Sequence, residues 1–213
     1  MNARSIAALS VLAFTAAACS RTGEIDSSGG ITAVRTVCPS VAVPAQTGDV
    51  TTFTSATDRS ADAIDVNAII TNVRSTCSDG ADPIVTQISF DVLARRTDTA
   101  AAREVVLPYF TTVLQGGSVV VAKRVGRVAL RFDAGQARAR ASATATTYLT
   151  RAAATLPADI REQITRERKA GREDAAIDPL ADPAVRTAVA RATFEALVGF
   201  QLTDDQLKYN VTR

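Results

Sequence analysis

Alternation of apolar and polar side chains constrains the fold of this chain more than any other feature of its sequence. Within residues 84–94, Ile84, Ile88, Phe90 and Val92 share one side, and polar residues occupy the other. A period of two is typical of a strand that buries one face in an antiparallel sheet. The abundant Val and Thr residues suit such strands as well.

Similar patterns predict further strands, separated by the turn signals at residues 116–117 and 133–135. We expect these strands over residues 105–114, 119–125, 128–132, 138–149 and 193–202. The alanine-rich stretch 138–149 could also form a helix, but its threonines and its strict alternation favour a strand. Pro108 indicates a sheet edge or a bulge. The fold class is therefore predicted to be all-β, an antiparallel β-sandwich of immunoglobulin- or fibronectin-like architecture.

A helical insertion is predicted before the last strand, over residues 156–183. Its exposed helix would end at Gly171, and a loop containing Pro and Asp residues would follow. Residues 183–192 leave two alternatives open: a helix capped by Asp182 with Pro183 at its first position, or a strand. A short helix is expected from Thr203, whose side chain would cap it.

The first residues have the pattern of a secretory signal peptide, predicted to span residues 1–18. Arg4 supplies a positive charge, the uncharged apolar run from Ile6 follows, and three alanines end at Ala18. This run is too short to cross a bilayer as a permanent helix. The sequence therefore predicts export from the cytoplasm.

The three alanines stand directly before Cys19 and with it resemble the lipobox of bacterial lipoproteins, although Ala16 stands where that family prefers Leu. The resemblance implies that Cys19 becomes the lipidated N-terminus, so that residues 19–36 tether the domain 37–213 to a membrane. By resemblance to the sorting rule of these lipoproteins, Ser20 in place of Asp favours the outer membrane, and we expect the domain on its periplasmic face. Ordinary cleavage after Ala18 is the alternative, and it would release a soluble periplasmic protein.

Cys38 and Cys77 are the remaining cysteines, and an oxidising periplasm favours a disulfide between them. We expect residues 38–53 and 62–77 to form one antiparallel hairpin with the two cysteines opposite each other at its open end. A redox-active dithiol is the alternative, but the pair lacks the CxxC spacing.

The absence of histidine limits the chemistry of the chain. It excludes Ser-His-Asp and Cys-His arrangements and HExxH zinc sites, and no metal-binding or cofactor-binding motif is present. The formal net charge of +2 gives no support for nucleic acid as a partner. We therefore expect no cofactor, no metal and no enzyme activity. A carboxylate-dependent enzyme acting on periplasmic polymer is the alternative.

A basic stretch in the predicted insertion provides the candidate contacts for a partner protein or an anionic envelope polymer. Its members are Arg161, Arg166, Arg168, Lys169 and Arg172. A solvated helix face with Glu162 and Glu167 interleaved is the plainer interpretation.

The chain as a whole resembles the small envelope lipoproteins of alphaproteobacterial type whose function is unknown. The resemblance lies in the Cys19 signal, the Cys38-Pro39 element and the closing segment 194–202. It implies a membrane-anchored, non-enzymatic binding or assembly module, and it brings no site residues with it.

Overall fold

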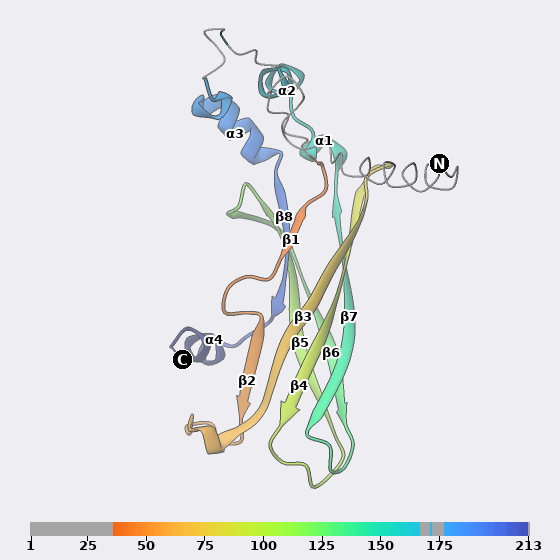
Figure 1. Cartoon of the computed structure of the whole chain (residues 1–213), viewed down its shortest axis with the longest axis vertical. Coiled ribbons are helices and arrows are strands. Elements are labelled where there is room, and N and C mark those ends of the chain that lie inside the picture. The colour runs from red at the N-terminus through yellow and green to blue at the C-terminus, as the bar shows by residue number, and fades with distance from the viewer. Residues whose placement is uncertain (1–35, 167–170, 172–176, 213) are drawn as a thin grey trace, which may run out of the picture.

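The computed structural model describes residues 36–166, 171 and 177–212, which form two four-stranded sheets packed face to face (Figure 1). One sheet has the order β2-β3-β4-β7 and the other the order β1-β8-β5-β6. The strands are β1 (Ser40–Ala42), β2 (Asp49–Phe53), β3 (Ile64–Ser78), β4 (Ile84–Arg96), β5 (Arg103–Gln115), β6 (Val119–Phe132), β7 (Arg138–Leu149) and β8 (Phe194–Phe200).

Most of the helices lie between β7 and β8 in sequence and gather at one end of the sandwich (Figure 1). The helices are α1 (Arg151–Ala154), α2 (Ala158–Thr165), α3 (Pro183–Arg191), α4 (Asp204–Thr212) and the 3-10 turns η1 (Ala61–Ala63) and η2 (Pro179–Ala181). None of these described helices is long and apolar enough to span a membrane.

Helix α3 resolves the alternatives for residues 183–192 in favour of a helix. The Asp182 carboxylate accepts a hydrogen bond from the Ala184 amide at 2.7 Å, and Pro183 occupies the first position. Both features favour initiation at this point. Helix α2 ends at Thr165, so the expected end at Gly171 is wrong.

The crossings between the sheets confirm the predicted sandwich with a helical insertion before its last strand. The connections β4–β5 and β7–β8 each pass from one sheet to the other, while β4 pairs with β7 and β5 pairs with β8. Strands B, C, E and F of immunoglobulin domains are interlocked in the same way. Here β1 lies parallel to β8.

The core consists of two apolar clusters stacked along the sandwich. The larger cluster includes Phe90, Phe132 and Phe200, and the smaller one contains Ile84 and Leu149. A polar layer lies between the two clusters. It consists of the buried side chains of Thr86, Thr111 and Thr147, each of which lies on its strand between a residue in or packed against the larger cluster and a residue of the smaller one. Thr86 and Thr147 are direct cross-strand partners, and all three hydroxyl oxygens lack a hydrogen-bond partner among the described residues.

Tyr109 connects the two sheets across the larger cluster. Its ring packs edge-on against Phe90 with the centroids 5.1 Å apart, and its hydroxyl donates to the Thr144 carbonyl oxygen at 3.0 Å. Gly126 is the cross-strand partner of Tyr109, and a Cβ atom at this position would overlap the ring. The glycine in β6 is therefore required by the close approach of the ring.

Cys38 and Cys77 form the expected disulfide, with their Cα atoms 6.1 Å apart, but the expected hairpin is confirmed only for residues 49–53 and is wrong for the part nearer Cys38. β2 pairs with β3, whereas β1, which follows Cys38, belongs to the opposite sheet. Prolines interrupt a continuous strand here, and the chain turns where the Thr47 amide donates to the Pro44 carbonyl oxygen. The disulfide thus joins the start of one sheet to β3 of the other.

A bulge in β3 directs Cys77 toward the smaller core cluster. The register of β3 against β4 shifts between Thr71 and Arg74, and Asn72 within the bulge has a φ of 52°. One extra residue reverses which positions face inward. Ala68 and Ile70 face the core before the bulge, and the odd-numbered Cys77 faces it afterwards.

Candidate functional site

The structure describes only part of the basic stretch that the sequence singled out. Arg161 and Arg166 lie on and just after α2, both exposed, and Arg166 forms an ion pair with Glu162 at 3.7 Å. Five residues apart in a helix, they do not share a face. The other members, Arg168, Lys169 and Arg172, lie outside the described residues, as does Cys19.

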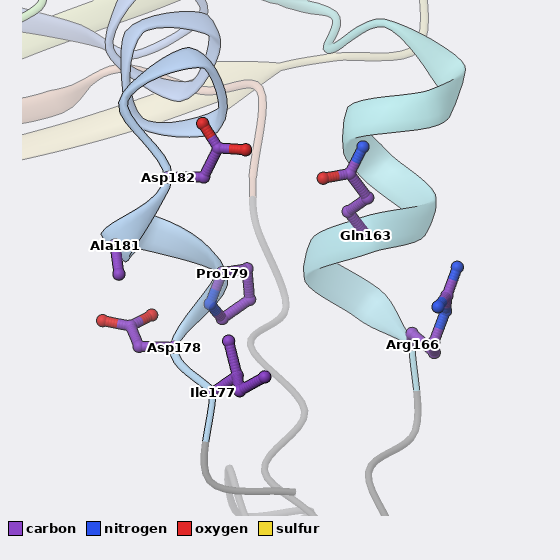
Figure 2. Close-up of a pocket in the computed structure, with 7 residues that line it drawn as sticks. All are labelled: Gln163, Arg166, Ile177, Asp178, Pro179, Ala181 and Asp182. Atoms are coloured by element: carbon purple, nitrogen blue, oxygen red, sulfur yellow. The ribbon is translucent and has the colours of Figure 1, made fainter. Parts of the chain in front are cut away.

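A cleft of about 270 Å³ separates α2 from the segment that precedes α3 (Figure 2). Gln163 and Arg166 line one side, and Asp178 and Asp182 line the other. Both aspartates act as caps: Asp178 accepts from the Leu180 amide at 2.9 Å, and Asp182 caps α3. Their carboxylates therefore serve the local fold.

The outer surface of the β2-β3-β4-β7 sheet carries a second and more distinctive group of side chains. Two adjacent cross-strand rows from β3, β4 and β7 surround a hollow of about 450 Å³. We call this surface the arginine face, and define it by Asn67, Ile69, Leu93, Arg95, Arg138 and Arg140.

Arg95 and Arg138 lie directly opposite each other at one edge of the arginine face. Both are exposed, and neither forms an ion pair with any residue of the described chain. Like charges directly opposite on a sheet are destabilising. The stability of the sheet therefore does not explain why two arginines occupy these opposite positions. Two adjacent guanidinium groups are, however, well suited to bind an anionic ligand.

Arg140 is held in place by a network around Asp91. The Asp91 carboxylate accepts hydrogen bonds from Arg140 at 2.7 Å, Ser142 at 2.6 Å and Asn72 at 2.8 Å. The Ser142 hydroxyl, then the Asn72 amide and the Arg140 guanidinium, lower the pKa of Asp91 below its ordinary value. The carboxylate is thus ionised at neutral pH and positions Arg140 without neutralising Arg95 and Arg138.

The floor of the arginine face is apolar. Ile69 and Leu93 are cross-strand partners whose side chains are 48% and 42% exposed. A second hollow, beside Pro44 and Gly48, shares Asn67 and Ile69 with the first. The surface therefore combines an apolar floor with cations at its edge, which suits an anionic ligand that also has apolar groups.

This arrangement is suited to binding. Asp91 has a lowered pKa and is not poised to donate a proton at neutral pH, so it gives no support to the alternative of a carboxylate-dependent enzyme. Within residues 36–166 and 177–212, no cluster of three or more Cys, Asp or Glu side chains is placed to hold a metal ion.

The sequence placed the three arginines of the arginine face on polar strand faces but did not bring them together. As expected, Arg95 lies on the polar face of the strand that begins at Ile84, which is β4. Arg138 and Arg140 lie on the polar face of β7, also as expected. The missing information was that β4 and β7 are neighbours. A single sequence contains no signal for such a long-range pairing.

No protein-family model, curated protein or solved structure matches the chain significantly. The geometry described above is therefore the basis for assigning a function.

Proposed function

We propose that this chain is an envelope lipoprotein, anchored to the periplasmic face of the outer membrane through Cys19, that acts as a non-enzymatic binding module. The signal-like segment before Cys19 supports the anchor, and the Cys38–Cys77 disulfide is consistent with an oxidising compartment. The sandwich presents the arginine face as its binding surface. The ligand class is an anionic envelope polymer with phosphate or carboxylate groups.

The Arg95–Arg138 pair is the single observation that carries the binding proposal. Each guanidinium can donate two parallel hydrogen bonds to a phosphate or carboxylate group. An anionic group bound between the two guanidinium groups would remove the repulsion between them. Because this repulsion destabilises only the free protein, its removal adds to the free energy of binding. Arg140, already oriented by Asp91, would contact a neighbouring anionic group.

Polyphosphate is a suitable probe for this site. The double variant Arg95→Gln/Arg138→Gln should weaken polyphosphate binding to the purified protein at least about tenfold, as expected when two charge-assisted contacts are lost. Arg161→Gln/Arg166→Gln removes the same charge from the helical insertion and should change the affinity less than about twofold. The reverse ranking of the two variants would assign binding to the insertion and refute the proposed site.

Metabolic labelling with an azido fatty acid tests the anchor separately. The wild-type protein should incorporate the label and enter the detergent phase of a Triton X-114 partition, because acyl chains contribute about 0.8 kcal/mol per buried methylene. Cys19→Ser should do neither. A wild-type protein without label that stays in the aqueous phase would instead be a soluble periplasmic protein, whatever its affinity for polyphosphate.

A further inference from the structure

The first half of β6 is exposed on both of its faces, which is unusual for a strand of a sandwich. β6 is the edge strand of its sheet, and every residue from Val119 to Val125 is exposed. Val119 is 56% and Val125 59% exposed, whereas Val128 and Leu130 further along the strand are buried. This segment therefore lies at the open lateral edge of its sheet, where it pairs with the buried residues Thr111 and Val113 of β5.

Among the described strands, only β5 pairs with this segment, so the backbone groups along its outer edge are open to a further strand. The Pro108 carbonyl oxygen accepts a hydrogen bond from the Gln201 amide, so Pro108 faces the β8 side of β5. In an antiparallel ladder, the backbone N–H and C=O groups of successive residues point to alternate sides of the strand. Those of Thr111 therefore point toward its partner Arg124 in β6. The peptide groups of Lys123 and Val125 consequently point away from the sheet, where another strand can pair with them.

The same edge is basic. Lys123 lies 5.3 Å from the centroid of the Phe110 ring and Arg124 lies 5.8 Å from that of Tyr148. Arg127 follows on the outer side. Of the carboxylates that the structure describes, none forms an ion pair with these three cations.

We propose that the outer edge of β6 binds an extended, acidic segment of a partner protein, which adds a strand to the β1-β8-β5-β6 sheet. Backbone pairing would occur at Lys123 and Val125, carboxylates would face Lys123 and Arg127 on the outer face of the sheet, and β-branched side chains would lie on the opposite face of the added strand. A second copy of this chain fits less well, because pairing two β6 edges would bring two sets of cations together. This surface is separate from the arginine face and does not depend on its ligand.

A short peptide of alternating Glu and Val residues can test this inference. The peptide should bind the purified protein and slow amide exchange at Lys123 and Val125, and alternating Lys and Val should bind at least about tenfold more weakly because its charges are repelled. Val125→Pro removes an outward amide and one exposed valine side chain, and it should abolish binding. Val106→Pro, at an open stretch of β5 near Pro108, is the matched control and should leave binding unchanged.

Three results would overturn the inference. The first is acidic-peptide binding that survives Val125→Pro, and the second is equal binding of the acidic and basic peptides. The third is a concentration-dependent dimer of the wild-type protein that Val125→Pro abolishes, since this would make a second copy the occupant. Failure of the acidic peptide to bind a folded wild-type protein counts against the inference as well.

Discussion

Arg96 is a buried cation whose hydrogen-bond partners are all backbone carbonyl oxygens. Only 3% of the residue is exposed, and the guanidinium donates to Gln136 and Ala101 at 2.9 and 2.7 Å and to Asp133 at 2.8 Å. It also lies over the Phe132 ring, 5.0 Å from the centroid. One side chain therefore connects the β4–β5 loop with the β6–β7 loop.

Replacing Arg96 should destabilise the fold strongly. Arg96→Met should lower the free energy of unfolding by at least about 3 kcal/mol, because several charge-assisted hydrogen bonds that join two loops are lost together with the contact over the Phe132 ring. Arg95→Met, one residue earlier on the exposed face, should change it by less than about 0.5 kcal/mol. Urea unfolding measures both values, and similar losses for the two variants would contradict this role of Arg96.

Asp91 should make stability depend on pH in the acid range. Its pKa is lowered in the folded state, chiefly by the Ser142 hydroxyl, so the ionised form stabilises the fold. That contribution is present above the unfolded-state pKa of about 3.9 and is lost as the pH falls through the lower folded-state pKa. Asp91→Asn should therefore be less stable than wild type at pH 7 and lose less stability on acidification. Parallel pH profiles for the two proteins would exclude this linkage.

Among the elements, β4 and β7 show how a polar layer can interrupt a sandwich core. Thr86 and Thr147 stand where an apolar pair would join the two clusters, and their buried hydroxyls have no hydrogen-bond partner in the part of the chain that the structure describes. Thr86→Val and Thr147→Val should each stabilise the protein by about 1 kcal/mol, because an unsatisfied buried hydroxyl is removed at constant shape. Thr144→Val, on the exposed face of β7, should be neutral. Thermal unfolding measures the effect, and destabilisation by either buried substitution would show that the hydroxyls have partners.

The strands with clear alternation could be predicted from the sequence, and the irregular segments could not. Residues 84–94 and 138–149 match β4 and β7 closely, because burial of one face imposes a period of two. The bulge at Asn72 inverts this pattern within β3, and only pairing with β4 reveals the extra residue. The separation of β1 from β2 was missed for a similar reason, since β1 depends on a distant partner in β8.

At the scale of the whole molecule, the Cys38–Cys77 disulfide restrains the N-terminal edge of one sheet against the other. The cysteines are 39 residues apart. In the chain-entropy model, a loop of this length corresponds to about 3–4 kcal/mol of stability. Cys38→Ser and Cys38→Ser/Cys77→Ser should therefore unfold at the same, lower urea concentration. Two free thiols in native wild-type protein, with unchanged stability of the variants, would disprove the bridge.

The candidate site could be predicted less well than the fold. Sequence reasoning selected the basic stretch beginning at Arg161, because charges close together in a helix are visible in the chain itself. The arginine face draws on β3, β4 and β7, whose neighbourhood follows from the interlocked topology of the sandwich. The sequence identifies the arginines on the polar faces of β4 and β7. Which strands become neighbours, and so which polar side chains form one surface, is decided only when the sheets assemble.

Mapping of polyphosphate contacts by backbone amide chemical shifts tests the central claim most directly. Titration of the purified protein should shift the amides of Asn67, Leu93 and Arg138 together, with smaller changes over residues 158–165. These shifts should disappear in Arg95→Gln/Arg138→Gln. Shifts confined to residues 158–165, with an unperturbed outer sheet, would contradict the assignment of the arginine face as the binding surface.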